Sequence, residues 1–355
     1  MGFRKILITG GAGFVGSNLA VLFKRHFDSV GVVVADNLKR RGSELTLTRL
    51  ASFGIDFRHA DIRCPEDLAE LPDFDLMIDC SAEPSVHAGG TGSPQYVLNT
   101  NLAGTLNCLE AARRRNAQFL FLSTSRVYPI EALNALPFVE KETRYSWTDA
   151  TPSHPFVAGI HEGFPLNGAR SMYGASKLAC EQIIQEYVAN YKMPAMINRC
   201  GVLAGPWQMG RVDQGVVSLW CARHFYKKSL RYTGFAGSGK QVRDVLHVED
   251  LFDLLVKQLK QTQDWDGTPY NVGGGEAISV SMRELTKICQ DVVGHSIEIT
   301  PFPETSPLDL RIYVTDARRA QKTFDWTPQR SVAQTVEDIY VWIRENSEML
   351  QPILS

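Results

Sequence analysis

A tyrosine and a lysine stand four residues apart in the stretch SMYGASK, residues 171–177. On a helix, Tyr173 and Lys177 lie on the same face. A tyrosine hydroxyl has an ordinary pKa of about 10, which is too high for a proton acceptor at neutral pH, and a nearby ammonium group favours its ionised form. The pair is therefore a candidate for removing the proton of an alcohol. The same spacing also occurs on solvated helix faces, so the rest of the chain must decide.

A glycine-rich turn, ITGGAGFVGSNLA at residues 8–20, carries a second chemical signal. Gly10, Gly13 and Gly16 lie between an apolar run that reads as a strand and an amphipathic segment that reads as a helix. Such glycines allow a tight turn and a close approach of the backbone to a pyrophosphate, while the helix N-terminus supplies N–H groups. We therefore expect a dinucleotide here; a plain strand-to-helix turn is the alternative.

The type of dinucleotide depends on Asp36, which ends the next strand 20 residues after Gly16. Its carboxylate would accept hydrogen bonds from the adenosine ribose diol and repel a 2′-phosphate, which favours NAD over NADP. The cations Lys39, Arg40 and Arg41 follow directly and would suit that phosphate, so NADP stays as the alternative.

Beside NAD, the tyrosine and lysine acquire distinct roles. Tyr173 would take the proton of an alcohol during its oxidation, and Lys177 would tune the tyrosine and hold the nicotinamide ribose. Thr124 ends the apolar run QFLFLST, and its hydroxyl would complete the site.

Alternating segments must position these residues. Apolar runs that read as buried strands occupy 5–10, 30–36, 75–80, 118–124 and 194–200. Amphipathic segments that read as helices lie near 14–27, 43–53, 95–115 and 173–192. This alternation predicts an α/β fold with a Rossmann-like, doubly wound parallel sheet and a ligand crevice at the carboxyl ends of its strands.

The alternation ends after residue 200, which predicts a smaller α/β C-terminal domain that binds substrate and closes over the crevice. We expect the NAD-binding Rossmann domain in residues 1–200 plus about 242–262. The substrate-binding domain is expected in about 201–241 and 263–355.

Composition excludes several function classes. The chain has 355 residues, is 44% hydrophobic and carries a formal net charge of −2, so no global field favours nucleic acid or a membrane. Seven scattered cysteines without CxxC spacing indicate reduced thiols, a cytoplasmic location and no zinc site. The basic run 223–231 is either a solvated helix face or a docking site for a phosphorylated ligand. His87, His161 and Glu162 lack metal-ligand spacing, although direct contact of His161 or Glu162 with a sugar stays open.

The motifs TGGAGFVGS, LSTSRVY and YGASK, in this order, resemble the extended short-chain dehydrogenase/reductase superfamily over essentially the whole chain. The resemblance implies that Thr124, Tyr173 and Lys177 are catalytic and that NAD is tightly bound. It also implies a homodimer or homotetramer formed through the helix with YxxxK and the helix near 95–115. The residues that it places at the cofactor are Gly10, Gly13, Phe14, Val15, Gly16, Asp36, Asn37, Asp61, Ile62, Ser81, Ala82, Asn101, Ser123, Tyr173 and Lys177.

The sugar-nucleotide branch of this superfamily gives the expected substrate and its partners in the chain. The resemblance places Thr124, Gln214, Arg243 and Arg311 at a nucleotide-diphosphate sugar. The two arginines would bind phosphate, and a structural salt bridge is the alternative for each. Asp61 either accepts a hydrogen bond from the adenine amine or caps the next helix.

The reaction type rests on finer motifs. Sugar-nucleotide 4,6-dehydratases typically carry Asp-Glu after the catalytic threonine, whereas Ser125 and Arg126 follow Thr124 here, which disfavours dehydration. The stretches 142–147, 213–221 and 239–247 (ETRYSW, DQGVVSLWC and GKQVRDVLH) resemble the family of CDP-tyvelose 2-epimerase, also called CDP-paratose 2-epimerase. That resemblance implies transient oxidation and re-reduction at C2 of a CDP-linked deoxyhexose.

Other functions stay open at this point. A UDP-hexose 4-epimerase or a nucleotide-sugar reductase of the same fold would use the same catalytic residues. A non-catalytic NAD-binding scaffold or sensor is the alternative from another class. Val202 and Ser306 depart from the pattern of the relatives, as does the run 79–86, and these changes bear on which hexose or nucleotide is accepted.

Overall fold

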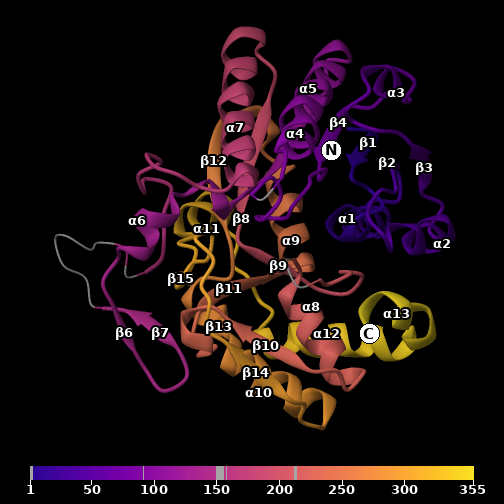
Figure 1. Ribbon diagram of the computed structural model, residues 1–355. Coiled ribbons are helices and arrows are strands. Elements are labelled where there is room, and N and C mark those ends of the chain that lie inside the picture. The colour runs from indigo at the N-terminus through magenta and orange to yellow at the C-terminus, as the bar shows by residue number, and fades with distance from the viewer. Residues whose placement is uncertain (1–2, 91, 149–155, 157, 212–213) are drawn as a thin grey trace.

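The computed structural model describes residues 3–90, 92–148, 156, 158–211 and 214–355. At its centre is a seven-stranded parallel sheet in the order β12-β8-β5-β4-β1-β2-β3 (Figure 1). Its strands are β1 (Lys5–Thr9), β2 (Gly31–Asp36), β3 (Asp56–His59), β4 (Leu76–Asp79), β5 (Gln118–Thr124), β8 (Ala195–Cys200) and β12 (Asp266–Val272). The predicted doubly wound parallel sheet is confirmed, with the reversal of strand order between β1 and β4.

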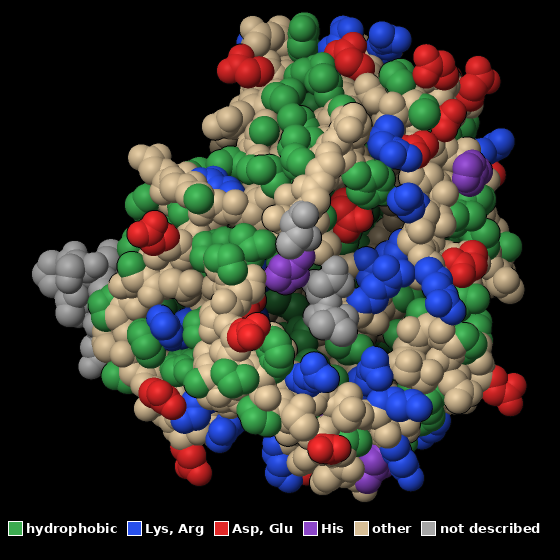
Figure 2. All heavy atoms as spheres, in the orientation of Figure 1, with side chains coloured by type: hydrophobic (Ala, Val, Ile, Leu, Met, Phe, Trp, Pro, Cys, Tyr) green, Lys and Arg blue, Asp and Glu red, His purple; other side chains and the backbone are tan. Residues whose placement is uncertain are grey.

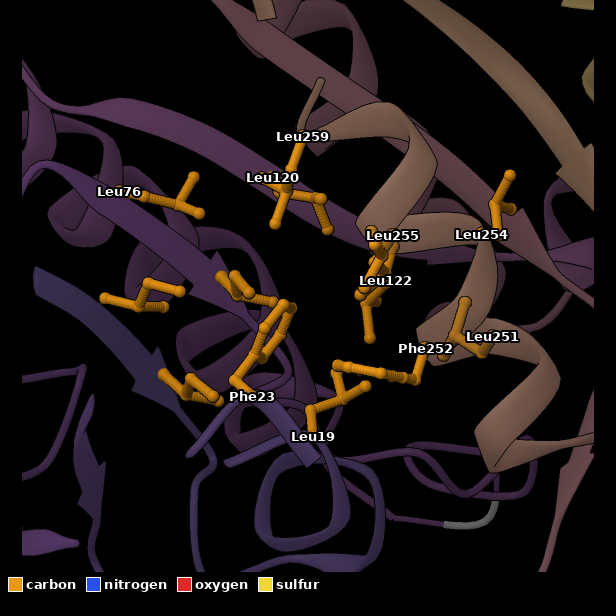
Figure 3. Close-up of a cluster of buried hydrophobic side chains, with 14 of the residues drawn as sticks. Leu19, Phe23, Leu76, Leu120, Leu122, Leu251, Phe252, Leu254, Leu255 and Leu259 are labelled. Atoms are coloured by element: carbon orange, nitrogen blue, oxygen red, sulfur yellow. The ribbon is translucent and has the colours of Figure 1, made fainter. Parts of the chain in front are cut away.

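The central strands are apolar on both sides because helices cover both faces of the sheet. Leu120 and Leu122 of β5 point to one face, while Phe119 and Phe121 point to the other. The helices on the first face are α1 (Phe14–His26), α2 (Thr46–Ser52), α9 (Val248–Gln258) and α11 (Arg318–Phe324). Figure 3 shows Phe23 of α1 and leucines of α9 packed against the leucines of β4 and β5.

The second face carries three helices, one of which holds Tyr173 and Lys177. They are α3 (Pro65–Ala69), α5 (Gly104–Arg114) and α7 (Met172–Tyr191). α4 (Gln95–Leu98) and a π-helical segment, Asn99–Ala103, precede α5, so the helix expected near 95–115 is confirmed as one nearly continuous run. α5 and α7 lie side by side at the top of Figure 1.

A smaller layer of strands and helices follows β8. Its sheet joins β9 (Val202–Ala204), β11 (Val242–His247), β13 (Ser279–Ser281) and β15 (Ile312–Tyr313), and β10 (Leu230–Thr233) pairs with β14 (Ile299–Phe302). A separate core forms around α8 (Val216–Phe225), α10 (Met282–Val293), α12 (Val332–Glu345) and α13 (Ser347–Leu354). α6 (Ile130–Asn134) and the hairpin of β6 (Phe138–Glu140) and β7 (Tyr145–Trp147) complete the elements.

Two segments lie in a different sheet from the one that the expected domain boundaries imply. β12 was expected in the substrate-binding domain, but it pairs with β8 and forms one edge of the central sheet. β11 was expected in the Rossmann domain, but it pairs with β9, β13 and β15 in the small sheet. Both differences concern strands whose partners are distant in the sequence. The division into two domains itself stays a prediction.

A buried ion pair attaches α7 to the central sheet. Glu181 of α7 accepts hydrogen bonds from Arg199 of β8, with 2.7 Å between Glu181 Oε2 and Arg199 Nη2, and from the Ser123 hydroxyl of β5. The side chains of Glu181 and Arg199 are only 3% and 4% exposed. Arg199 also donates to the Tyr128 hydroxyl over 3.1 Å. α7 is thereby held against the carboxyl ends of β5 and β8.

None of the helices within the described ranges is long and apolar enough to cross a bilayer.

Replacing Glu181 with Gln should lower the free energy of unfolding by about 3–5 kcal/mol, because Arg199 would keep a buried charge without its counter-ion. The measurement is the midpoint of urea unfolding followed by far-UV circular dichroism. Asp291→Asn is the control, since it breaks the exposed pair with Lys287, which is worth about 0.5 kcal/mol at most. Equal midpoints for the two variants would contradict the structural role of the ion pair.

Candidate active site

One large cavity, of about 970 Å³, lies where the carboxyl ends of the central strands meet the smaller layer. The ends of β4, β5 and β8 contribute Cys80, Thr124 and Cys200 to its wall. Side chains of α8, β10 and β11 line the other side, among them Trp220, Tyr232 and Arg243. Figure 2 shows a hollow near the middle of one face of the molecule, bordered by Lys and Arg side chains. This is the crevice that the sheet topology predicts.

The glycine-rich turn between β1 and α1 forms one end of the cavity. Gly10 has a φ of +63°, which L side chains rarely adopt, and a Cβ there would lie 2.8 Å from the Cys80 carbonyl oxygen. A Cβ on Gly16 would lie 2.3 Å from the Gly10 carbonyl oxygen. Only glycine therefore lets the first turn of α1 pack against the end of β1. The N–H groups of Gly11, Ala12 and Gly13 donate within the protein, so an anion here would be bound by the N–H groups at the N-terminus of α1 itself.

The tyrosine of YxxxK stands in the first turn of α7. Ser171 caps this helix, since its hydroxyl accepts a hydrogen bond from the Gly174 N–H over 3.1 Å. Tyr173 and Thr124 line the same cavity, and their side chains are hydrogen-bonded to each other. Burial raises the pKa of Tyr173 to about 12, while the hydrogen bond with Thr124 and the charge of Arg126 act in the opposite direction.

Lys177 lies one turn further along α7 and is only 2% exposed. Its ammonium group lies 3.9 Å from the centroid of the Phe121 ring. No side chain or carbonyl in the described ranges accepts a hydrogen bond from this ammonium group, although its residue lines the cavity. A ligand in the cavity that accepts a hydrogen bond from Lys177 would therefore stabilise the charge of this nearly buried residue. The ribose hydroxyls of a nicotinamide nucleotide have the required chemistry, and the residues present therefore fit NAD.

Most of the expected site residues line the cavity, and seven lie outside its lining. Those that line it are Gly10, Gly13, Phe14, Val15, Gly16, Ala82, Ser123, Thr124, Tyr173, Lys177, Gln214 and Arg243. Those that the structure places outside its lining are Asp36, Asn37, Asp61, Ile62, Ser81, Asn101 and Arg311. The roles of individual residues stay predictions in both groups.

Several residues outside the lining have structural partners. Asp36 accepts from the N–H groups of Ala12 and Leu38, so its carboxylate already supports the glycine-rich turn, and burial raises its pKa. Asp61 is paired with Arg63, whose hydrogen bonds lower the pKa of the carboxyl group.

The loop after β4 is held in a similar way. Asn101 accepts from the Glu83 N–H over 2.7 Å and donates to the Ser176 hydroxyl over 3.2 Å. It therefore fixes this loop against α7.

The three cations after Asp36 are also engaged by the protein. Arg40 donates to Gln214 and to the Met209 carbonyl, and Arg41 donates to the Pro352 carbonyl. The Lys39 ammonium group lies 5.0 Å from the centroid of the Tyr96 ring. This use of all three supports NAD over NADP.

The two arginines expected at phosphate differ in position. Arg243 lines the cavity, and burial lowers its pKa to about 9. Arg311 lies outside the lining, with its guanidinium 4.0 Å from the centroid of the Phe138 ring and close to the rings of Tyr145 and Phe235. The sequence shows both as arginines beside strands, and only the tertiary structure reveals the aromatic cage around one of them.

Of the histidine and glutamate candidates, one lines the cavity and two lie outside its lining. His87 lines the cavity. His161 lies outside it, with Nδ1 accepting from the Gly163 N–H, and Glu162 accepts from the Asn271 N–H over 2.7 Å. Asp213, in the stretch DQGVVSLWC, lies outside the described residues.

Sequence reasoning missed several lining residues, of which Arg126 is nearest to the chemistry. In the sequence, Arg126 stands where the dehydratase pattern has the glutamate of Asp-Glu, and this position alone does not indicate that it lines the site. The others with charged or aromatic side chains include Trp220, Arg223, Arg231 and Tyr232. Arg223 and Arg231 belong to the basic run 223–231. The sequence-based prediction that this run binds a phosphorylated ligand is the signal that could have identified them.

Comparison with known proteins gives a consistent set of relatives. The model of the NAD dependent epimerase/dehydratase family matches residues 6–273. CDP-paratose 2-epimerase of Salmonella typhi is 33% identical over 350 residues, 95% of this chain and 98% of the relative. UDP-glucose 4-epimerase of Erwinia amylovora is 27% identical over 362 residues, with 97% and 98% covered.

The solved structures agree with this fold. UDP-glucuronic acid 4-epimerase of Bacillus cereus, in complex with UDP-glucuronic acid and NAD, superposes with a TM-score of 0.77. The sequence identity is 23%, and 96% of this chain and 99% of the other are covered.

Gly16→Ala should abolish cofactor retention, because the added Cβ has no room beside the Gly10 carbonyl oxygen. The measurement is the amount of NAD released from the purified protein by denaturation. Gly31→Ala is the control, since a Cβ there meets its nearest neighbour at an ordinary 3.5 Å. A Gly16 variant that kept a full complement of NAD would contradict the expected position of the pyrophosphate.

Proposed function

The chain belongs to the NAD dependent epimerase/dehydratase family, and we propose that it is an NAD-dependent sugar-nucleotide epimerase that inverts C2 of a CDP-linked deoxyhexose. The observation that carries the proposal is the meeting of Thr124, Tyr173 and Lys177 in a cavity that also contains the glycine-rich turn and Arg243. The 33% identity with CDP-paratose 2-epimerase over 95% of the chain supports the choice of substrate and carbon.

When bound, NAD⁺ supplies a two-electron acceptor that returns the same electrons later in the cycle. Tyr173 accepts the proton of the sugar hydroxyl as the carbon is oxidised to a ketone. For this role, the charges of Lys177 and of the oxidised nicotinamide ring would have to offset the burial that raises the pKa of Tyr173. The single O–H of Thr124 would donate to the reacting oxygen and orient it. Tyr173 then returns the proton to the oxygen after the 2-ketosugar has presented its other face, so the net reaction is an inversion without net redox change.

The positions of the basic groups support two separate ligand regions. Lys177 and the glycine-rich turn belong to the layer of the central sheet and suit the cofactor. Arg243, Arg223 and Arg231 come from the smaller layer and suit the diphosphate and nucleotide of the substrate. The sugar would then lie between these regions, next to Tyr173.

We also propose a homodimer or homotetramer in the cytoplasm. Leu106 of α5 and Met172 and Tyr191 of α7 are large hydrophobic residues that are 40%, 43% and 56% exposed. These helices lie side by side, and the exposed apolar side chains spread along them support contact with a second copy. All seven cysteines are free thiols, which agrees with a reducing compartment. Light scattering of the purified protein tests the oligomer.

In heavy water, CDP-paratose or CDP-tyvelose should be converted to its C2 epimer with essentially no deuterium at C2. The electrons and hydrogen removed from the carbon return to it from the cofactor and do not exchange with solvent. NMR of the product, with UDP-glucose and UDP-galactose as parallel substrates, measures both the inverted carbon and its label. Inversion of the UDP-hexoses alone would favour a 4-epimerase, and heavy labelling of C2 would contradict transient oxidation.

Tyr173→Phe should reduce turnover by a factor of about 10² to 10⁴, because the proton acceptor is lost. NAD retention should stay close to that of the wild type, since Lys177 and the glycine-rich turn are unchanged. Tyr191→Phe is the matched control, a tyrosine on the same helix that is 56% exposed. Unchanged turnover in the Tyr173 variant would refute the mechanism, and retained NAD without any turnover in the wild type would point to a scaffold or sensor.

A further inference from the structure

Arg126 is fixed by its backbone between two residues of the catalytic set. It belongs to the 3-10 turn Ser125–Val127 that follows β5, and its N–H donates to the Thr124 hydroxyl oxygen over 3.2 Å. Its carbonyl packs against Gly174, where a Cβ would lie only 2.1 Å from the Arg126 oxygen. The turn therefore touches the start of α7 directly beside Tyr173, and its position relative to the reacting groups is closely determined.

The guanidinium group of Arg126 lies in the cavity wall beside that of Arg243. Arg126 Nη1 donates to the Leu308 carbonyl over 3.2 Å, and Arg243 Nη2 donates to the Leu310 carbonyl over 2.7 Å. These two acceptors are two residues apart on one segment, and both arginines line the cavity. Two cations that arise far apart in the sequence are thus brought to the same part of the wall.

The protein only partly offsets the charges of this pair. Burial lowers the pKa of both guanidinium groups, and for Arg243 the positive charge of Arg126 lowers it further. The carboxylate of Asp309 favours the charged form of both arginines and that of Asp244 favours charged Arg243, but burial outweighs them. A ligand with negative charge on this wall would relieve the repulsion, and guanidinium groups match phosphate oxygens in geometry.

The substrate class proposed above carries such a charge at one defined place. In a nucleotide sugar the diphosphate is attached to C1, which is bonded to C2, whereas C4 lies on the opposite side of the hexose ring. An anion-binding group in contact with the turn beside Tyr173 therefore favours a reacting carbon next to the diphosphate. A carboxylate at residue 126, as in the dehydratase pattern, would repel the same phosphate.

We propose that Arg126, together with Arg243, binds the sugar-side phosphate of the substrate and so holds C2, and not C4, at Tyr173. The inference rests on the proposed function for the identity of the substrate. Arg126 is thereby a specificity-determining residue: its guanidinium group touches the phosphate, and the phosphate places the carbon.

The test is a comparison of nucleotide affinities in the NAD-loaded protein by isothermal titration calorimetry, with CDP against CMP and UDP against UMP. The wild type should bind at least one diphosphate more tightly than its monophosphate. Arg126→Met should weaken that diphosphate by about tenfold or more and the monophosphate by about threefold at most, because only the terminal phosphate loses its partner. The diphosphate affinity of Arg126→Lys should lie between those of the wild type and Arg126→Met, since lysine keeps the charge and lacks the planar fork.

Arg114→Met is the control, an arginine of α5 whose side chain is 72% exposed. Equal affinity of the wild type for both forms, or an equal loss of both in the Arg126 variants, would overturn the inference. If Arg126→Met fails to fold, the Arg126→Lys variant carries the same comparison. Inversion at C4 in the product analysis would refute the proposed function, while the preference for the diphosphate still tests the contact of Arg126 with phosphate.

Discussion

The geometry of the site depends on the buried ion pair between Glu181 and Arg199. Taking two charges out of water is costly, and the cost is offset only where both are closely paired and their remaining hydrogen-bonding positions are filled. Ser123 and Tyr128 supply these partners, so the charged network is satisfied only when α7 lies in one position over β5 and β8. Glu181 follows Lys177 and Tyr173 on α7, and this position therefore sets where both reach the cavity.

The same constraint links the two ends of the chemistry. Ser123 and Thr124 are consecutive residues of β5 that both line the cavity, and Ser123 also donates to Glu181, so the ion pair and the site share one strand end. The turn that follows β5 then contacts the first turn of α7 at Gly174. The strand end, the turn and the helix thus form one rigid support, and rigid support is what proton transfer at a defined distance requires.

Positive charge is concentrated in one cavity of this molecule, and the formal net charge does not reveal it. The formal net charge is −2, but Arg126, Arg223, Arg231 and Arg243 all line one cavity. The cofactor region relies on backbone N–H groups and on Lys177, whereas the substrate region relies on guanidinium groups. This division suits two ligands that each contain a diphosphate, since separate sets of donors keep them in separate places.

The sequence alone determined the features whose parts are close together along the chain. The glycine-rich turn, the Tyr173 and Lys177 spacing, and the alternation that produces the parallel sheet depend on local backbone geometry and hydrophobic period, and the structure contains each of them. Tertiary structure decided which distant side chains meet. It added β12 to the central sheet, enclosed Arg311 among aromatic rings and brought Arg126 beside Arg243. The physical reason is that burial and the neighbours of a charge depend on how separate elements pack, and residue type and spacing carry no record of that packing.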